Sequence, residues 1–368
     1  MAEACWEFCT SMYNIFFGDR LFIAIQRTYK VKLTAIRVRV EVDVPQAPED
    51  GLLVKIHAAG VCHSDITLLE MEPQPPNHLK KYTLGHEGCG EVISVGSAAS
   101  KFVPGDIVAI LSIPGCGKHT CPECTRGLEA LCQTGERYGI GYHGSFAPYV
   151  AVRERAAVKL PSGLSPVLGA VVTDAVLTAY GATVERANVK KSDTVLLFGL
   201  GGLGFNALQI ILSIGARVIV ADNRQEVLDE AVKFGVKAKN VVPPGTSAAE
   251  FVTRNKLVID KTVDFVGVSD TFRAAIDSVR IGGTVVVVGL INPHLSFNSR
   301  PAILKAVDIL FTFGGSYTSL EASLDLVTKE IVKPQVVTRG MHELPQALED
   351  LHHGKVKSRV VLVPEILA

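Results

Sequence analysis

The chain has 368 residues, of which 48% are hydrophobic and 33 are glycine, and its formal net charge is zero at pH 7. This length predicts roughly two domains with enough apolar residues for a sizeable core. The balanced charge and the lack of a Lys/Arg-rich run exclude nucleic acid and an anionic membrane as expected main partners.

The N-terminal segment, residues 1–30, is expected to be an extension whose role the sequence does not indicate. Its apolar stretch from Met12 to Ile25 is interrupted by Gly18-Asp19-Arg20, well short of a membrane span. The segment also lacks a basic leading region followed by a clean apolar core and a small-residue cleavage site. We therefore expect no signal peptide.

The next part of the chain, from about Leu33, is typical of short strands separated by Gly and Pro. Alternating apolar residues predict strands at 34–42, 52–57, 90–96, 107–113 and 145–152. This half is therefore predicted to be β-rich, as an irregular barrel that carries loops. The tail from Val336 to Val363 returns to short mixed elements and is expected to complete the same domain.

The chain alternates between helix and strand from about Leu168, which predicts a parallel sheet with helices on both faces. The predicted strands are 194–198, 217–221, 263–266, 284–288 and 309–313, and the predicted helices are 168–183, 205–214, 225–234 and 271–279. The fold class is therefore α/β. The β-rich domain is expected at 31–175 and 316–368, and the parallel-sheet domain at 176–315.

A thiol and an imidazole, Cys62 and His86, lie on two separate segments that are predicted to be strand ends or tight turns. Thiolate and imidazole are both common zinc ligands. A catalytic zinc needs ligands from separate elements and one open coordination position. We interpret the pair as part of such a site, with the Ser64 hydroxyl beside the open position. A small buried cysteine and a core histidine are the ordinary alternative for either residue alone.

The third protein ligand is left open between two carboxylates. Asp174 is a lone acid in an apolar stretch, where an aspartate would most simply be a helix N-cap. As a carboxylate at the expected domain junction, it could instead complete the zinc site. Glu87, next to His86, competes for that role or orients the ligands from behind.

A second metal motif is formed by four of the eight cysteines, in the pattern Cys116-x4-Cys121-x2-Cys124-x7-Cys132. Four thiolates in one loop fill the coordination of a tetrahedral ion, so the motif predicts a structural zinc. Four unrelated surface thiols are the alternative, and His119 inside the motif is interpreted as a bystander. The crowding favours a reducing, cytoplasmic compartment over a secreted disulfide framework.

A glycine-rich turn, Gly199-Leu200-Gly201-Gly202-Leu203-Gly204, follows a predicted strand and opens a helix, as dinucleotide-binding turns do. Asp222 ends the next predicted strand. A carboxylate there accepts hydrogen bonds from the ribose hydroxyls and repels a 2′-phosphate, which predicts NAD rather than NADP. Arg224 acts against this preference, because an arginine can hold that phosphate.

Together these motifs resemble the zinc-dependent medium-chain alcohol dehydrogenases, from about Leu33 to Pro364. The resemblance rests on the segments 60–65, 85–96 and 173–180, the four cysteines, the glycine-rich turn and 358–362. It implies a GroES-like catalytic domain at 31–175 and 316–368 and a Rossmann NAD-binding domain at 176–315. Zinc and nicotinamide would lie in the cleft between them.

By position, Cys62, His86 and Asp174 match the family's catalytic zinc ligands, and Glu87 matches the residue that can transiently displace water at that zinc. Ser64 matches the hydroxyl that takes the substrate proton. The expected cofactor-binding residues are His63, Thr178, Gly199, Gly201, Gly202, Leu203, Gly204, Asp222, Asn223, Arg224, Val266, Leu290 and Arg359. An Asp at the third ligand position is similar to the bacterial-type branch that acts on secondary and aryl alcohols.

Three features depart from the family pattern. Thr67 stands where many relatives have a histidine that passes the proton to solvent, so the relay is altered or uses water. The first gap between the lobe cysteines is x4 where the usual pattern has x2, and the N-terminal extension has no counterpart in the family.

The resemblance implies an NAD-dependent enzyme that interconverts primary or secondary alcohols with aldehydes or ketones by hydride transfer. It would carry one catalytic and one structural zinc and form a homodimer or homotetramer. A reductase of a C=C or C=N bond in a specialised substrate stays open, because that reaction does not need the proton path lost at Thr67. A non-catalytic member of the fold is the other alternative, and the complete sets of ligands argue against it.

Overall fold

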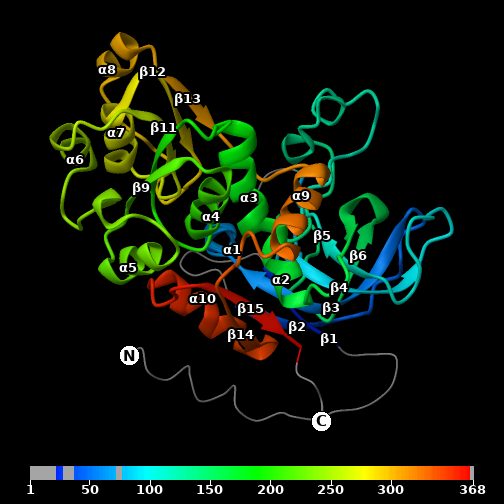
Figure 1. The fold of residues 1–368 in the computed structure, drawn as a ribbon. Coiled ribbons are helices and arrows are strands. Elements are labelled where there is room, and N and C mark those ends of the chain that lie inside the picture. The colour runs from blue at the N-terminus through cyan, green and yellow to red at the C-terminus, as the bar shows by residue number, and fades with distance from the viewer. Residues whose placement is uncertain (1–21, 28–36, 72–76, 365–368) are drawn as a thin grey trace.

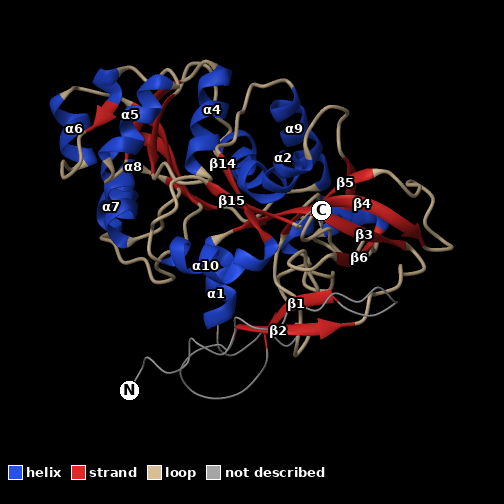
Figure 2. Ribbon diagram, turned by 90° about the horizontal axis from the view of Figure 1, so that it is seen from below, coloured by secondary structure: helices blue, strands red, loops and turns tan. Residues whose placement is uncertain are grey.

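The computed structural model describes residues 22–27, 37–71 and 77–364, which build two large sheets lying side by side (Figures 1 and 2). A smaller antiparallel pair is formed by β1 (Phe22–Arg27) and β2 (Arg37–Val42). Part of the predicted N-terminal extension therefore forms a strand. Its residues 1–21, including much of the apolar stretch, lie outside the described residues.

The seven-stranded sheet combines strands from both ends of the described chain. Its strands are β14 (Val336–Gly340), β15 (Arg359–Val363), β3 (Gly51–Val61), β4 (Glu87–Val95), β5 (Ile107–Ile110) and β7 (Ala157–Lys159), in that order, with β6 (Tyr149–Arg153) paired to β3. The central strand β3 is antiparallel to both β4 and β15, and Gly60 lies opposite Glu87 on one side and Val361 on the other. This register brings the ends of three distant segments to one place, directly before Cys62.

The six-stranded sheet is parallel throughout, as predicted. Its strands are β10 (Val241–Val242), β9 (Arg217–Ala221), β8 (Thr194–Phe198), β11 (Ile259–Asp264), β12 (Val279–Val287) and β13 (Asp308–Phe311), in that order. Successive residues of β8 enter different cores, because a strand points its side chains to alternate faces. Leu197 packs in the core shared with α4 and α5, whereas Leu196 packs with α6 and α7.

The helices cover both faces of the parallel sheet and line the region between the two sheets (Figure 2). They are α1 (His63–Glu70), α2 (Pro166–Val171), α3 (Leu177–Tyr180), α4 (Gly204–Ile214), α5 (Gln225–Lys233), α6 (Ala248–Arg254), α7 (Ser269–Ser278), α8 (Ser299–Lys305), α9 (Tyr317–Thr328) and α10 (Leu344–His352). The sequence does not predict α1, α6, α8, α9 or α10. Four of these five helices have only seven to nine residues, so their apolar periodicity is too brief to be recognised, whereas α9 has twelve residues and is missed despite its length.

One continuous helical run, Pro166–Arg186, connects the two sheets. It consists of α2, a π-helical segment at Val172–Val176, α3 and a second π-helical segment at Gly181–Arg186. The Ser165 side chain caps its start, accepting a hydrogen bond from the Leu168 backbone N–H at 3.3 Å. The interpretation of Asp174 as an N-cap is therefore wrong, because Asp174 lies two turns further along, inside the first π-helical segment.

This run is also long and apolar enough to cross a membrane by composition, but 72% of its most apolar stretch is buried inside the protein. It packs on β3 and β4 through α2 and on α4 through α3. The expected domain boundary at residue 175 falls inside this run, and the division of the chain into domains stays a prediction.

Candidate active site and metal centres

Four side chains of the types that bind metal ions converge where β3, β4 and the helical run meet. Ligand atoms of Cys62, His86, Glu87 and Asp174 all lie within 4.8 Å of one another. The Oδ2 atom of Asp174 is 3.5 Å from Cys62 Sγ and 3.9 Å from His86 Nε2. Zinc binds sulfur at about 2.3 Å and nitrogen or oxygen at about 2.0–2.2 Å, so atoms at these separations can share one ion. The structure therefore brings the predicted ligands together, and the donor set fits zinc.

The backbone accounts for this convergence. Cys62 follows the last residue of β3 and is the N-cap of α1, and His86 immediately precedes β4. Gly60 allows the two strands to approach closely, since a β-carbon there would lie 1.9 Å from Glu87 Oε2. Cys62 and His86 thus lie at strand ends, as predicted. The helix α1 that follows Cys62 was not predicted.

Asp65 is a further residue of the site, to which the sequence assigns no role. It is fully buried, and its carboxylate accepts a hydrogen bond from the Cys62 backbone N–H at 2.9 Å and lies 3.1 Å from His86 Nδ1. Burial lowers the pKa of His86, but the charge and hydrogen bond of Asp65, with a contribution from Cys62, raise it well above its usual value. Asp65 therefore fixes the ring with Nε2 toward Asp174, as carboxylates behind metal-binding histidines do. The signal available in the sequence was its place three residues after Cys62, at the third position of a helix.

Arg359 joins the two competing carboxylates. Its Nη2 donates to Asp174 Oδ2 at 2.7 Å, and its Nε donates to Glu87 Oε2 at 3.0 Å, with a further contact from Nη2 to Glu87 Oε1. Thr178 donates to the other oxygen of Asp174 at 2.9 Å. Both oxygens of the fully buried Glu87 are held by Arg359, whereas Asp174 Oδ2 also faces Cys62 and His86. This geometry favours Asp174 as the third ligand and Glu87 as its neighbour.

Ser64, His63 and Thr67 all lie on the exposed side of the first turns of α1. Ser64 Oγ is 3.6 Å from Cys62 Sγ, so its hydroxyl is at the edge of the ligand cluster. Partial burial of the ring and the charge of Arg359 lower the pKa of His63. The Thr67 hydroxyl donates to the His63 carbonyl at 3.4 Å and is turned toward the helix backbone.

The glycine-rich turn connects β8 to α4, and sterics require glycine at two of its positions, Gly199 and Gly204. Gly199 has a φ of 81°, and a β-carbon there would lie 2.7 Å from Val266 Cγ2. A β-carbon on Gly204 would lie 1.8 Å from the Gly199 carbonyl oxygen, so helix and turn could not pack. Around Gly201 there is open space, as an approaching pyrophosphate requires.

The other expected nucleotide contacts lie around this turn. A β-carbon on Gly202 would be 3.5 Å from Arg359 Nη1, so the turn lies next to the guanidinium that binds Asp174. Leu290 lies in the loop after β12 with 68% of its surface exposed, and the next residue donates to the Val266 carbonyl. Asp222 and the exposed Asn223 follow the end of β9, and the Arg224 guanidinium binds the Asp222 carboxylate through two hydrogen bonds of 2.9 Å.

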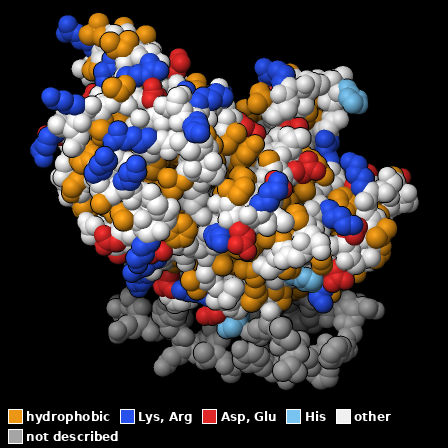
Figure 3. Space-filling view, in the orientation of Figure 1, with side chains coloured by type: hydrophobic (Ala, Val, Ile, Leu, Met, Phe, Trp, Pro, Cys, Tyr) orange, Lys and Arg blue, Asp and Glu red, His pale blue; other side chains and the backbone are white. Residues whose placement is uncertain are grey.

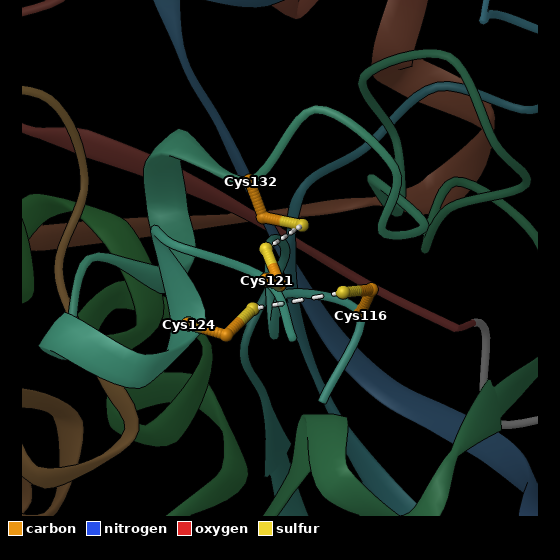
Figure 4. Close-up of side chains that lie close together, drawn as sticks. All are labelled: Cys116, Cys121, Cys124 and Cys132. Carbon is orange, nitrogen blue, oxygen red and sulfur yellow. Dashed lines mark hydrogen bonds between the residues drawn. The ribbon is translucent and has the colours of Figure 1, made fainter. Parts of the chain in front are cut away.

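The four cysteines of the predicted structural site point toward one another in a loop with little regular structure (Figure 4). The sulfur atoms of Cys116 and Cys124 are 3.8 Å apart, and those of Cys121 and Cys132 are also 3.8 Å apart. Hydrogen bonding from Thr134 lowers the pKa of Cys116 to about 6, whereas burial raises that of Cys124. The exposed His119 is not part of the group. The four sulfurs fit a tetrahedral zinc despite the longer first gap.

Comparisons with known proteins agree with both halves of this description. A family model described as the alcohol dehydrogenase GroES-like domain matches residues 48–162, and one described as zinc-binding dehydrogenase matches residues 202–329. An alcohol dehydrogenase of Geobacillus stearothermophilus is 30% identical, over 88% of this chain and 94% of that protein. An alcohol dehydrogenase of a Moraxella species is 28% identical, with the same coverage of each chain. The structure of acetophenone reductase from Geotrichum candidum in complex with NAD is similar, with a TM-score of 0.84 and 30% identity over 95% of this chain and 98% of that one.

The Arg359–Glu87 pair yields a prediction about stability. Replacing Arg359 by Leu leaves the Glu87 carboxylate buried without its partner, and breaking a buried pair in this way costs about 3–5 kcal/mol. We expect this loss in the free energy of unfolding measured with denaturant. The double variant Glu87→Leu/Arg359→Leu removes both charges and should recover most of the loss. A double variant no more stable than Arg359→Leu alone would contradict the interpretation.

Proposed function

Since the chain belongs to the zinc-containing medium-chain alcohol dehydrogenase family, we propose that it is an NAD-dependent alcohol dehydrogenase. It would interconvert primary or secondary alcohols with aldehydes or ketones by hydride transfer. The observation that carries this proposal is the convergence of Cys62, His86 and Asp174 beside a dinucleotide-binding turn. Three protein ligands leave a fourth position of a tetrahedral zinc for the substrate oxygen, which distinguishes a catalytic site from a structural one.

The proposed roles follow from the contacts. Cys62, His86 and Asp174 would hold the catalytic zinc, which would supply a Lewis acid that lowers the pKa of a bound alcohol. Asp65 and Thr178 orient two of the ligands, and Arg359 holds Glu87 beside them. The four lobe cysteines hold a structural zinc. The nicotinamide would accept the hydride, and the protein would align it with the substrate carbon.

Ser64 is proposed to accept the proton of the alcohol while its own hydroxyl proton passes to water, because its hydroxyl lies at the edge of the ligand cluster and is exposed. The Thr67 hydroxyl instead donates to the His63 carbonyl and is turned toward the helix backbone. We therefore propose that the proton leaves from Ser64 through water, without a side-chain relay at position 67.

We propose for the folded chain the same two domains that the sequence predicts. The catalytic domain would comprise 31–175 and 316–368 and the coenzyme domain 176–315, with the zinc and nicotinamide sites at their junction. Unpaired thiols at all six described cysteines suit a reducing, cytoplasmic compartment. The substrate is a small alcohol or carbonyl compound.

Replacing Cys62 by Ser tests the zinc mechanism. We expect turnover of alcohols to fall to background and the zinc content, measured by mass spectrometry, to fall from two ions per chain to one. NADH binding, measured by its fluorescence, should persist, because the glycine-rich turn is untouched. The matched control Cys124→Ser should also lose one ion but keep the turnover of its folded fraction. Full activity of Cys62→Ser, or of enzyme stripped of metal, would contradict the proposal.

An exposed apolar surface supports a homodimer. The edge strand β13 pairs only with β12 among the described strands, and it carries Phe311 with 59% of its surface exposed. Ile303 and Leu304 on the neighbouring α8 are more than 70% exposed, and hydrophobic side chains gather over α8 at the top of the molecule (Figure 3). Unprotected edge strands pair readily with another copy, and contiguous apolar surface of this kind marks association sites. We propose that two copies join through β13, with a tetramer as a further step.

A lysine at position 311 tests this surface, because charged residues on an edge strand oppose pairing. We expect light scattering to give a dimer or larger for the unmodified chain and a monomer for Phe311→Lys at the same concentration. Val103→Lys places a lysine at a comparably exposed apolar residue in the loop between β4 and β5 and should leave the assembly intact. A monomeric unmodified chain would refute the dimer.

A further inference from the structure

The side chains of Asp222 and Arg224 form a closed pair at the end of β9, where the ribose of the adenosine half would lie. Asp222 Oδ2 accepts hydrogen bonds from the Leu200 backbone N–H at 2.8 Å and from Arg224 Nη2 at 2.9 Å. Its Oδ1 accepts from the Arg224 backbone N–H at 3.0 Å and from Arg224 Nε at 2.9 Å. A carboxylate offers about four lone-pair sites, so all of them are used. Ribose hydroxyls can therefore bind Asp222 only if the Arg224 guanidinium gives up its hydrogen bonds to this carboxylate.

The ion pair also neutralises the negative charge of Asp222, and the preference for NAD over NADP depends on that charge. The Asp222 side chain is 4% exposed, whereas 34% of the Arg224 side chain reaches the surface. Burial raises the pKa of Asp222, but Arg224 and the Leu200 N–H lower it by more, so the carboxylate is ionised and its charge is balanced by the guanidinium. A 2′-phosphate that approaches this site therefore contacts the exposed guanidinium of Arg224 first. The Asp222 carboxylate lies deeper, and its charge is already neutralised by Arg224. Arginine is the side chain best shaped to hold a phosphate.

We propose that the Asp222–Arg224 pair makes this site accept NADP as well as NAD, with Arg224 as the residue that determines specificity. This rests on the proposed dehydrogenase function and names its cofactor class more fully. NAD would bind by taking over lone pairs of Asp222 that Arg224 now occupies. NADP would bind by taking over the fork of Arg224 that Asp222 now occupies. Each nucleotide breaks part of the same ion pair, so neither has the advantage that an unpaired aspartate would give to NAD.

The alternative is that Asp222 only fastens the turn into α5, since Arg224 is the N-cap residue of that helix. The two explanations differ in what they predict for binding. A fastening role concerns the backbone N–H groups of Leu200 and Arg224, which survive truncation of the Arg224 side chain. Removing that side chain should then leave the ratio of the two nucleotide affinities unchanged.

The test measures the dissociation constants of NADH and NADPH on the zinc-loaded full chain, by nicotinamide fluorescence. We expect the two constants of the unmodified chain to lie within about tenfold of each other, a difference of about 1.4 kcal/mol at most. Arg224→Ala should weaken NADPH by about tenfold or more and leave NADH unchanged or tighter, because Asp222 is freed. Arg224→Lys should give an intermediate NADPH affinity, since it keeps the charge but loses the fork. Asp222→Ala should shift the ratio toward NADPH.

Arg254→Ala, at an exposed arginine on α6, is the matched control and should change neither constant. An unmodified chain that binds NADH more than about a hundredfold tighter than NADPH would overturn the inference. An equal loss of both affinities in Arg224→Ala would overturn it as well. Failure of the unmodified chain to bind either nucleotide would instead refute the dehydrogenase function on which the inference rests.

Discussion

The contact of Arg359 with the buried carboxylate of Glu87 and the partly buried carboxylate of Asp174 is the constraint on which the site depends. Arg359 starts β15, Glu87 starts β4 and Asp174 belongs to the helical run, so one guanidinium joins three elements that are far apart in sequence. Taking such charges out of water costs several kcal/mol each unless they are paired with good geometry. The register of β4 and β15 on β3 must therefore be correct before these charges can be buried. The arrangement of the candidate metal ligands therefore depends on the native register of the seven-stranded sheet.

The parts of the fold and of the site that depend on short stretches of sequence were predictable. The bounds of β8 and β9 and the role of the glycine-rich turn follow from a short apolar strand that ends in glycines required by sterics. Cys62 and His86 were predictable as ligands because few other roles suit that pair of side chains. Asp174 was not settled by local pattern: the residue that caps its helix is Ser165, nine residues earlier, and the contacts of Asp174 with Arg359 and Cys62 span 185 and 112 residues. Such pairings depend on strand register, which the sequence does not display.

The four-cysteine lobe shows which part of a metal motif matters. With zinc–sulfur bonds of about 2.3 Å, the edges of a tetrahedron are about 3.8 Å long, and two sulfur pairs of the lobe have that separation. The two additional residues after Cys116 are absorbed by a turn in which the Cys121 N–H donates to the Lys118 carbonyl. Gly115 and Gly117 on either side of Cys116 have φ values of 69° and 66°, which lets the chain bend sharply around the thiol. A zinc ion requires four sulfur atoms at the corners of a tetrahedron. The number of residues between the cysteines can vary, because it depends only on the path that the loop takes between them.

The distribution of burial separates the candidate metal ligands from the residues proposed to exchange a proton and to contact a nucleotide. Cys62, His86, Glu87 and Asp65 are nearly or completely buried, which keeps the ligands dry and strengthens their electrostatic interactions. His63, Ser64 and Thr67 on the adjoining helix are exposed, although they are separated from the buried ligands by only a residue or two. The start of α1 produces this division, because a helix turns successive side chains by about 100° and so alternates ligand-side and solvent-side residues. A strand continued through Cys62 would alternate strictly between two faces, and it could not place Cys62 and Asp65 inward with Ser64 at the edge between them.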